Sequence, residues 1–267
     1  MTSGFFCVLL SLCLLSTGVA KPAWTKDLSP PRFGPHPTIR PLKLVYSLSW
    51  KGALKSGSLV FELNKPDKRY PQYHVGQIYG GSTGFARTLF PYDGNFVSFL
   101  DNKTLWPVSF TGKETDRREV MESTNRYSRE SMSSVVKLTA LTDDGKTGTE
   151  KENFAFPNQL DALSAMYFIR SQPLNKGDEL KIVVHPFQSP YLARVKVLAR
   201  EKHLGQNAIK LSVNLQKIRQ SLKLKNYKKM KRCTLWLSDD QDRVPLELRT
   251  EVFIGDVRMT LKSRNPL

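Results

Sequence analysis

Hydrophobic and polar residues alternate with a period of two along most of this chain. Between residues 42 and 50 the even positions are all large and apolar, whereas the odd positions are Lys, Val, Ser and Ser. The same alternation predicts further strands at 59–63, 73–79, 96–100, 180–184, 195–198, 209–215, 234–238, 244–254 and 257–261. Neighbouring strands with short links must be antiparallel, because a parallel pair needs a crossover of about a dozen residues.

Two of the links are typical of hairpin turns. Gly255-Asp256 separates the last two predicted strands, and Asp239-Asp240-Gln241-Asp242 separates the pair before them. The pattern therefore predicts a mainly β protein built from successive hairpins.

One segment has a strong helical pattern, from about Leu160 to Arg170. Asn158 or Asp161 is suited to cap its start, and Pro173 follows its end. The helix has almost no polar face, which is typical of a helix buried on every side. We expect a single curved antiparallel sheet, a β-spiral or incomplete barrel, wrapped around this one buried helix.

The first 20 residues predict a secretory signal peptide. They contain no charged side chain, an apolar run covers 5–15, and small residues at Gly18 and Ala20 suit cleavage before Lys21. A retained membrane anchor is the alternative, but it needs an apolar core of about 20 residues. We expect a periplasmic or secreted protein with a proline-rich tether at 21–41 and one β domain at 42–267.

Lys and Arg number 41 against 24 acidic residues, a net charge of +17, and none of these residues lies in the first 20. Such an excess favours anionic partners. For an exported protein these are lipid headgroups or cell-wall polymers rather than nucleic acid. Simple solubility is the alternative explanation.

Eight of these cations lie close together with no acidic residue among them. They are Lys217, Arg219, Lys223, Lys225, Lys228, Lys229, Lys231 and Arg232. One interpretation is a solvated hairpin. The other is a surface that binds an anionic partner, because like charges at this density repel one another unless counter-charges gather.

The motif Gly80-Gly81-Ser82-Thr83-Gly84 matches the G-x-S-x-G nucleophile elbow, and a short helical stretch is possible after it at 85–89. An elbow belongs on a parallel α/β sheet, with an acid such as Asp161 or Asp178 and then His185 beside the serine. The chain lacks the repeated βαβ pattern that builds such a sheet, so we expect a glycine-rich turn. No catalytic residue is assigned.

No metal or cofactor is expected from the sequence. The four histidines show neither an i, i+4 pair nor a cysteine partner at zinc spacing. The carboxylates at 239, 240 and 242 suit calcium in principle, but a polar hairpin turn explains them better. Once a leader with Cys7 and Cys13 is removed, Cys233 has no cysteine partner, and we expect a buried strand residue there.

Several segments, taken together and in order, resemble the bacterial family known as domain of unknown function 3108. The segments are Leu44 to Gly52, Asp101 to Pro107, Asp161 to Arg170 with Pro173-Leu174 and Gly177-Asp178, and Leu235 to Asp240 with Val244-Pro245. The resemblance implies a Gram-negative envelope protein with a spiral or incomplete β-barrel, distantly similar to periplasmic envelope-integrity proteins and lipoprotein carriers. It implies no known reaction.

Two functional hypotheses follow. The first is a non-enzymatic envelope protein that binds a lipid-like or polymeric ligand, or a partner protein, in or around the curved sheet. The second is an envelope serine hydrolase that acts through Ser82.

Overall fold

The computed structural model describes residues 21–36, 40–141, 145–186, 189–227, 230–252 and 255–267. The expected signal peptide, residues 1–20, lies outside this part of the chain. The helices are η1 (Ala23–Asp27), α1 (Gly84–Leu89) and α2 (Ala162–Ser171). None of these described helices is long and apolar enough to cross a bilayer.

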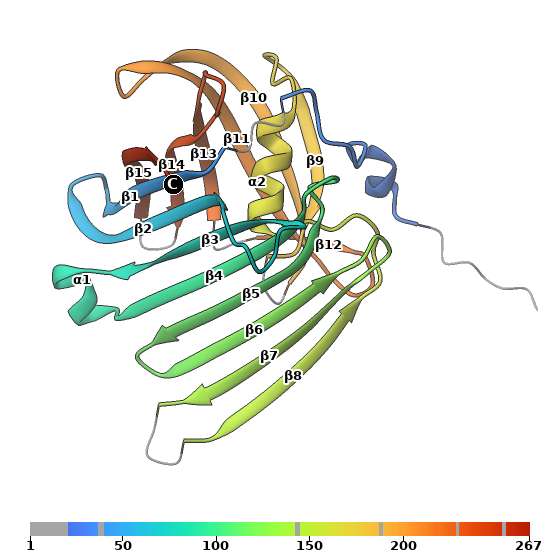
Figure 1. The fold of residues 1–267 in the computed structure, drawn as a ribbon, viewed down its shortest axis with the longest axis vertical. Coiled ribbons are helices and arrows are strands. Elements are labelled where there is room, and N and C mark those ends of the chain that lie inside the picture. The colour runs from blue at the N-terminus through green and yellow to red at the C-terminus, as the bar shows by residue number, and fades with distance from the viewer. Residues whose placement is uncertain (1–20, 37–39, 142–144, 187–188, 228–229, 253–254) are drawn as a thin grey trace, which may run out of the picture.

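A single antiparallel sheet of 15 strands forms the body of the protein (Figure 1). The first eight strands are β1 (Leu42–Trp50), β2 (Leu54–Lys65), β3 (Tyr73–Ser82), β4 (Tyr92–Asp101), β5 (Pro107–Asp116), β6 (Glu119–Tyr127), β7 (Met132–Ala140) and β8 (Thr147–Phe154). The others are β9 (Glu179–Val184), β10 (Tyr191–His203), β11 (Gln206–Ile218), β12 (Leu224–Asn226), β13 (Met230–Ser238), β14 (Pro245–Val252) and β15 (Gly255–Pro266).

Chain order and strand order agree almost everywhere in the sheet. Strands β1 to β8 lie side by side in sequence, and β9 to β15 return in sequence until β15 pairs with β1. The short β12 pairs only with β11 and stands off this path. The predicted curved antiparallel sheet with few helices is therefore confirmed, and it is not closed into a barrel.

Besides the short β12, four strands of the sheet, β5 to β8, were not predicted from the alternation. In β8 only Phe154 is buried, and the other seven residues are exposed. Strands β6 and β7 carry Ser123, Asn125 and Ser134 at buried positions, so their apolar pattern is weak. This part of the sheet extends away from α2 (Figure 1), and fewer of its residues need to be apolar.

Gly255 and Asp256, predicted as the turn between the last two strands, belong to β15 instead. Gly255 pairs with Val252 of β14 and Asp256 pairs with Glu251, and residues 253–254 lie outside the described residues. Gly255 has φ 115, a backbone conformation that favours glycine.

Helix α2 begins after Asp161, whose side chain accepts hydrogen bonds from the backbone N–H groups of Leu163 and Ser164. Ser164 in turn accepts from the Asp161 N–H and completes a capping box. Leu163 and Tyr167 pack with β1 and β2 residues, whereas Phe168 packs with β9 and β10. The helix thus joins the two halves of the sheet, which curls around it (Figure 1).

Helix α2 lies within the curl of the sheet as expected, but its residues are not equally buried on every side. Ala162, Met166 and Ile169 are only half-buried. Their spacing of four and three residues places them on one face of the helix. That face borders a cavity, described below.

The proline-rich segment that was expected to be a tether packs against the domain between Trp24 and His36. The Trp24 ring stacks on Phe156 with centroids 5.4 Å apart, and the Ser29 N–H donates to the Lys181 carbonyl at 2.9 Å. Further along, the Gly34 N–H donates to Ser171 Oγ at 2.9 Å. Residues 28–29 therefore cover part of the free edge of β9.

Candidate functional site: an apolar cavity beside α2

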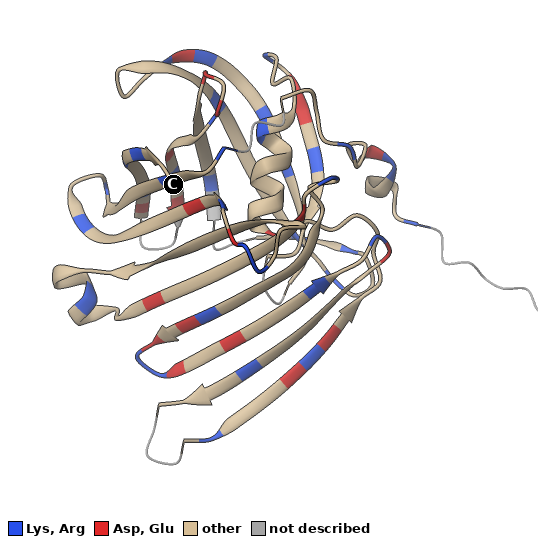
Figure 2. Cartoon of the chain, in the orientation of Figure 1, with Lys and Arg blue, Asp and Glu red and all other residues tan. Residues whose placement is uncertain are grey.

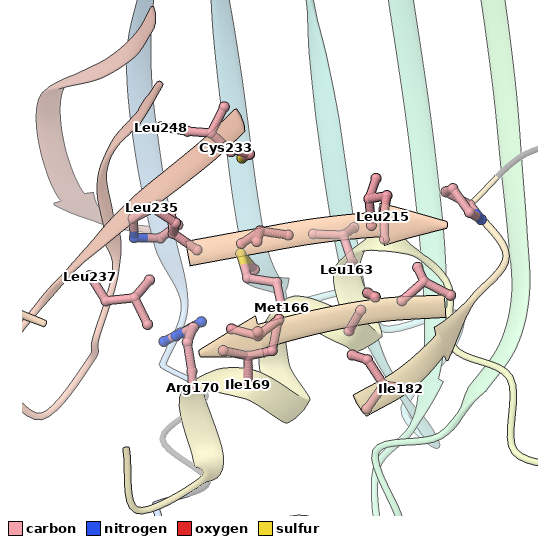
Figure 3. Close-up of a pocket in the computed structure, with 18 of the residues that line it drawn as sticks. Leu163, Met166, Ile169, Arg170, Ile182, Leu215, Cys233, Leu235, Leu237 and Leu248 are labelled. Carbon is pink, nitrogen blue, oxygen red and sulfur yellow. The ribbon is translucent and has the colours of Figure 1, made fainter. Parts of the chain in front are cut away.

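A cavity of about 340 Å³ lies between α2 and the concave face of the sheet (Figure 3). Its wall consists of the Ala162, Met166 and Ile169 face of α2 and inward side chains of β9, β10, β11, β13, β14 and β15. Phe61 of β2 and Ile78 of β3 complete it. Almost every side chain in this wall is a hydrocarbon.

The alternation of the strands explains which side chains reach the cavity. Ala193 pairs with Leu215, and Val195 pairs with Val213, across β10 and β11. Residues directly opposite one another in an antiparallel pair share a face, so all four line the cavity. Alanine at Ala193 and at Ala162, on opposite walls, leaves space that larger side chains would fill.

One end of the cavity, which we call the closed end, is formed by Arg170, Leu237 and Pro245, all buried. Arg170 is 4% exposed, and its Nε donates to the Asp242 carbonyl at 2.8 Å. Burial lowers the pKa of its guanidinium. Arg243 seals the same end, because its Nη1 donates to the Arg170 carbonyl at 2.9 Å in the last turn of α2.

The acidic link between β13 and β14 is a hairpin turn held by arginines, as the turn interpretation predicted. Asp239 pairs with Arg200, and Asp240 pairs with Arg264 at 2.6 Å. Asp242, whose side chain is fully buried, accepts from Arg40 Nε at 2.7 Å. In the described residues no cluster of three or more His, Cys, Asp or Glu side chains is placed to hold a metal ion.

Val184, Tyr191 and Leu215, all half-buried, line the part of the cavity beside β12, which we call the mouth. The ring of Tyr191 packs edge-on against that of Tyr227, with centroids 5.3 Å apart. Tyr227 follows β12 and belongs to the basic stretch. The basic stretch therefore lies beside the mouth.

Of the eight cationic side chains of the basic stretch the structure describes five, and all five are exposed: Lys217, Arg219, Lys223, Lys225 and Arg232. Lys228 and Lys229 lie outside the described residues, and the side chain of Lys231 is not described either. Leu222 and Leu224 point the opposite way and pack on the cluster around Phe154 and Leu192. Figure 2 shows that Lys and Arg are also spread over most of the sheet. Attachment of this stretch to an anionic surface stays a prediction.

Ser82 lies at the end of β3 and is followed by the short α1, as the motif suggested. Its Oγ accepts from the Tyr92 N–H at 3.0 Å and donates to the Tyr92 carbonyl at 3.4 Å. The proposed partners are engaged elsewhere: Asp161 caps α2, and His185 Nδ1 contacts Gln159 at 2.9 Å. Nothing among the described contacts joins Ser82 to a histidine or a carboxylate.

Cys233 is buried in β13, as predicted, and its side chain lines the cavity (Figure 3). Burial raises the pKa of its thiol to about 11, so the thiol stays protonated at neutral pH. Reasoning from the sequence missed the cavity itself. An all-apolar helix does not reveal which of its faces lacks a packing partner.

A comparison with solved structures finds a similar fold in another protein. A β-barrel-like protein of the DUF1849 family from Brucella abortus matches with a TM-score of 0.54 at 9% identity, over 86% of this chain and 98% of that one. A protein with a YmcC-like fold from Bacteroides fragilis matches with a TM-score of 0.31 at 10% identity, over 88% and 99%. At these identities the first match shows the fold alone.

The sequence comparisons show the family. A search of curated proteins finds no match to this chain. The family model described as "Protein of unknown function (DUF3108)" matches residues 45–262, which span nearly the whole sheet and α2. The chain therefore belongs to the DUF3108 family.

Proposed function

We propose that this chain is an exported envelope protein without catalytic activity, and that it binds a lipid-like ligand in the cavity beside α2. The observation that carries the proposal is the apolar cavity of about 340 Å³. Its volume falls in the range of small-molecule sites, about 300–1,000 Å³. The signal-peptide pattern of residues 1–20 supports export.

The composition of the wall favours a hydrocarbon chain over a polar ligand. A buried polar group needs a hydrogen-bonding partner, and the inward residues of β10, β11 and β13 are mostly aliphatic. Each methylene moved from water into such a site contributes about 0.8 kcal/mol. A bound chain would also cover the half-buried Met166 and Ile169.

The test is to purify the exported protein, extract it with organic solvent and identify bound lipids by mass spectrometry. A Met166→Trp variant places a larger side chain in the cavity and should lose the co-purified lipid. Val135→Trp is the matched control, because Val135 is 42% exposed on β7, away from the cavity. The proposal fails if parent and control carry no lipid, or if Met166→Trp carries as much as they do.

A further inference from the structure

Two lysines of the basic stretch share the face of the sheet that lines the cavity. On β11, Val213 and Leu215 line the cavity, and Lys217 is the next residue of the same alternation. The register confirms this, because Lys217 pairs with the cavity-lining Tyr191. On its other side Lys217 pairs with Lys225 of β12, so both lysines lie on this face.

The two tyrosines fix the position of this face independently. Tyr227 lies two residues after Lys225, and its ring contacts that of Tyr191. The row of inward residues on β11 thus runs from hydrocarbon at Val213 and Leu215 to ammonium at Lys217. The change occurs at the mouth of the cavity, where Tyr191 and Tyr227 stand at the boundary.

The direct opposition of two lysines is unfavourable for the folded protein alone. Like charges placed opposite each other on neighbouring strands destabilise a sheet. No acidic residue occurs between 217 and 232, and among the described residues no ion pair includes Lys217 or Lys225. An anion between the two ammonium groups would remove this repulsion.

We propose that Lys217 and Lys225 bind the anionic head group of an amphiphile whose hydrocarbon chain occupies the cavity. This rests on the proposed function and names the class of ligand: a chain with a carboxylate or phosphate at one end. The chain enters first and reaches toward Arg170, while the head group stays at the mouth.

The orientation follows from the cost of moving charge out of water. Arg170 at the closed end is also cationic, but a head group placed there must lose its water in an apolar cavity. At the mouth the head group keeps part of its hydration, because both lysines are exposed. The Arg170 guanidinium already donates to the Asp242 carbonyl, and Figure 3 shows it among Met166, Leu235 and Leu237.

Three probes with the same hydrocarbon chain test the head group: dodecanoate, dodecyl phosphate and the uncharged dodecanol. Their affinities are measured by calorimetry, at low salt and below micelle formation. The parent should bind the two anionic probes more tightly than dodecanol. In a Lys217→Gln/Lys225→Gln variant the affinity for the anionic probes should fall about tenfold, whereas dodecanol binding stays unchanged. Comparison of dodecanoate with dodecyl phosphate shows which head group is preferred.

A Lys176→Gln/Lys196→Gln variant is the matched control, because it loses the same charge at two exposed positions away from the mouth. Lys196 follows the cavity-lining Val195 and so lies on the opposite face of β10. The head-group proposal is overturned if the Lys217/Lys225 variant binds dodecanoate and dodecyl phosphate as tightly as this control, which would leave Arg170 as the anion site. Failure of the parent to bind any of the three probes overturns the proposed function itself.

Discussion

Asp161 places a carboxylate at the fully buried N-terminus of α2. One carboxylate oxygen accepts from the Leu163 and Ser164 N–H groups at 2.7 and 2.9 Å, and the other accepts from Ser98 Oγ at 2.7 Å. An Asp161→Ala variant should therefore lose about 1–2 kcal/mol of unfolding free energy. Urea unfolding at pH 7 measures it, and a loss near zero would show that the cap does not matter.

Substitution of Asp161 by Asn should have a different outcome, because Asn keeps an oxygen for the cap and carries no charge. Burial raises the pKa of Asp161, so the folded state holds this proton more tightly than the unfolded state. The parent then loses stability as pH rises from the unfolded pKa, about 3.9, toward the higher folded pKa. We therefore expect the unfolding free energy of the Asp161→Asn variant to rise relative to that of the parent between pH 3 and 7. A constant difference across this range contradicts the argument.

Glu247 of β14 should show the opposite dependence on pH. It is 2% exposed, its Oε1 accepts from Arg249 Nε at 2.8 Å, and its Oε2 lies 2.5 Å from His203 Nε2. Burial alone would raise its pKa, but the hydrogen bonds from Arg249 and His203 outweigh burial and hold the pKa below its ordinary value. Stability from this group is present above the unfolded pKa, about 4.3, and is lost as pH falls through the folded pKa.

A Glu247→Gln variant should therefore be less stable than the parent by about 2 kcal/mol at pH 7. The difference should shrink in acid, where the parent also loses its carboxylate. Unfolding curves at several pH values between about 2.5 and 7 make the measurement, because this range includes the ordinary pKa of a carboxyl group. If the difference stays the same at low pH, the lost stability comes from packing rather than from charge.

At the level of a single element, the two faces of α2 should respond differently to truncation. Phe168 is 1% exposed and packs edge-on against Phe33, with centroids 5.5 Å apart, so Phe168→Ala should cost about 3–5 kcal/mol. Met166 faces a cavity that already exists, and Met166→Ala should cost only about 1 kcal/mol. Guanidinium unfolding of both variants compares them, and equal costs would mean that the Met166 face is packed as tightly as the Phe168 face.

The strands that surround α2 were predictable, and those far from it were not. In β1 the alternation is strong because one side must pack against the helix and the core, where Leu44 and Tyr46 are fully buried. In β8 the sheet hydrogen bonds remain but little apolar burial does, so the sequence Thr147–Phe154 carries no hydrophobic period. Alternation of apolar and polar residues arises because one face of a strand is buried. A strand with no buried face therefore shows no such alternation in its sequence.

The candidate site was only half predictable for a related reason. The basic stretch could be identified from the sequence alone, because its eight Lys and Arg residues are close together in the chain. The cavity depends on distances between α2 and strands far from it in the chain, such as the 31 positions that separate Ala162 from Ala193 (193 − 162). The pairing of Lys217 with Lys225 likewise needed the register of β11 and β12.

At the scale of the whole molecule, the sheet has two ends that are protected in different ways. Leu160 and Ser29 hydrogen-bond to the outer edge of β9, through the carbonyls of Val183 and Lys181. Strand β8 has no such cover among the described residues and instead carries charged side chains at 150, 151 and 152. Charged side chains on an open edge discourage pairing with another chain. Both arrangements therefore hinder the pairing of a sheet edge with another chain.

The net charge of +17 leads to a final prediction about the whole protein, attachment of the basic stretch to an anionic envelope surface. Each basic residue near an anionic membrane contributes about 1 kcal/mol at low salt. The variant to test replaces four lysines of the stretch with Gln: Lys223, Lys228, Lys229 and Lys231. Lys217 and Lys225, the two lysines at the mouth, are kept. It should bind anionic vesicles more weakly than the parent in sedimentation at low salt, and neither should bind neutral vesicles.

The matched control removes the same charge from four exposed lysines elsewhere: Lys137, Lys151, Lys176 and Lys196. Equal losses in the two variants would assign vesicle binding to net charge and not to the stretch. At about 1 M salt the Debye length falls to roughly 3 Å, so parent binding to vesicles should disappear. A hydrocarbon chain in the cavity should stay bound under the same conditions, because salt does not weaken apolar burial. Sedimentation at high salt followed by lipid extraction from the supernatant protein therefore separates surface attachment from ligand binding in one experiment.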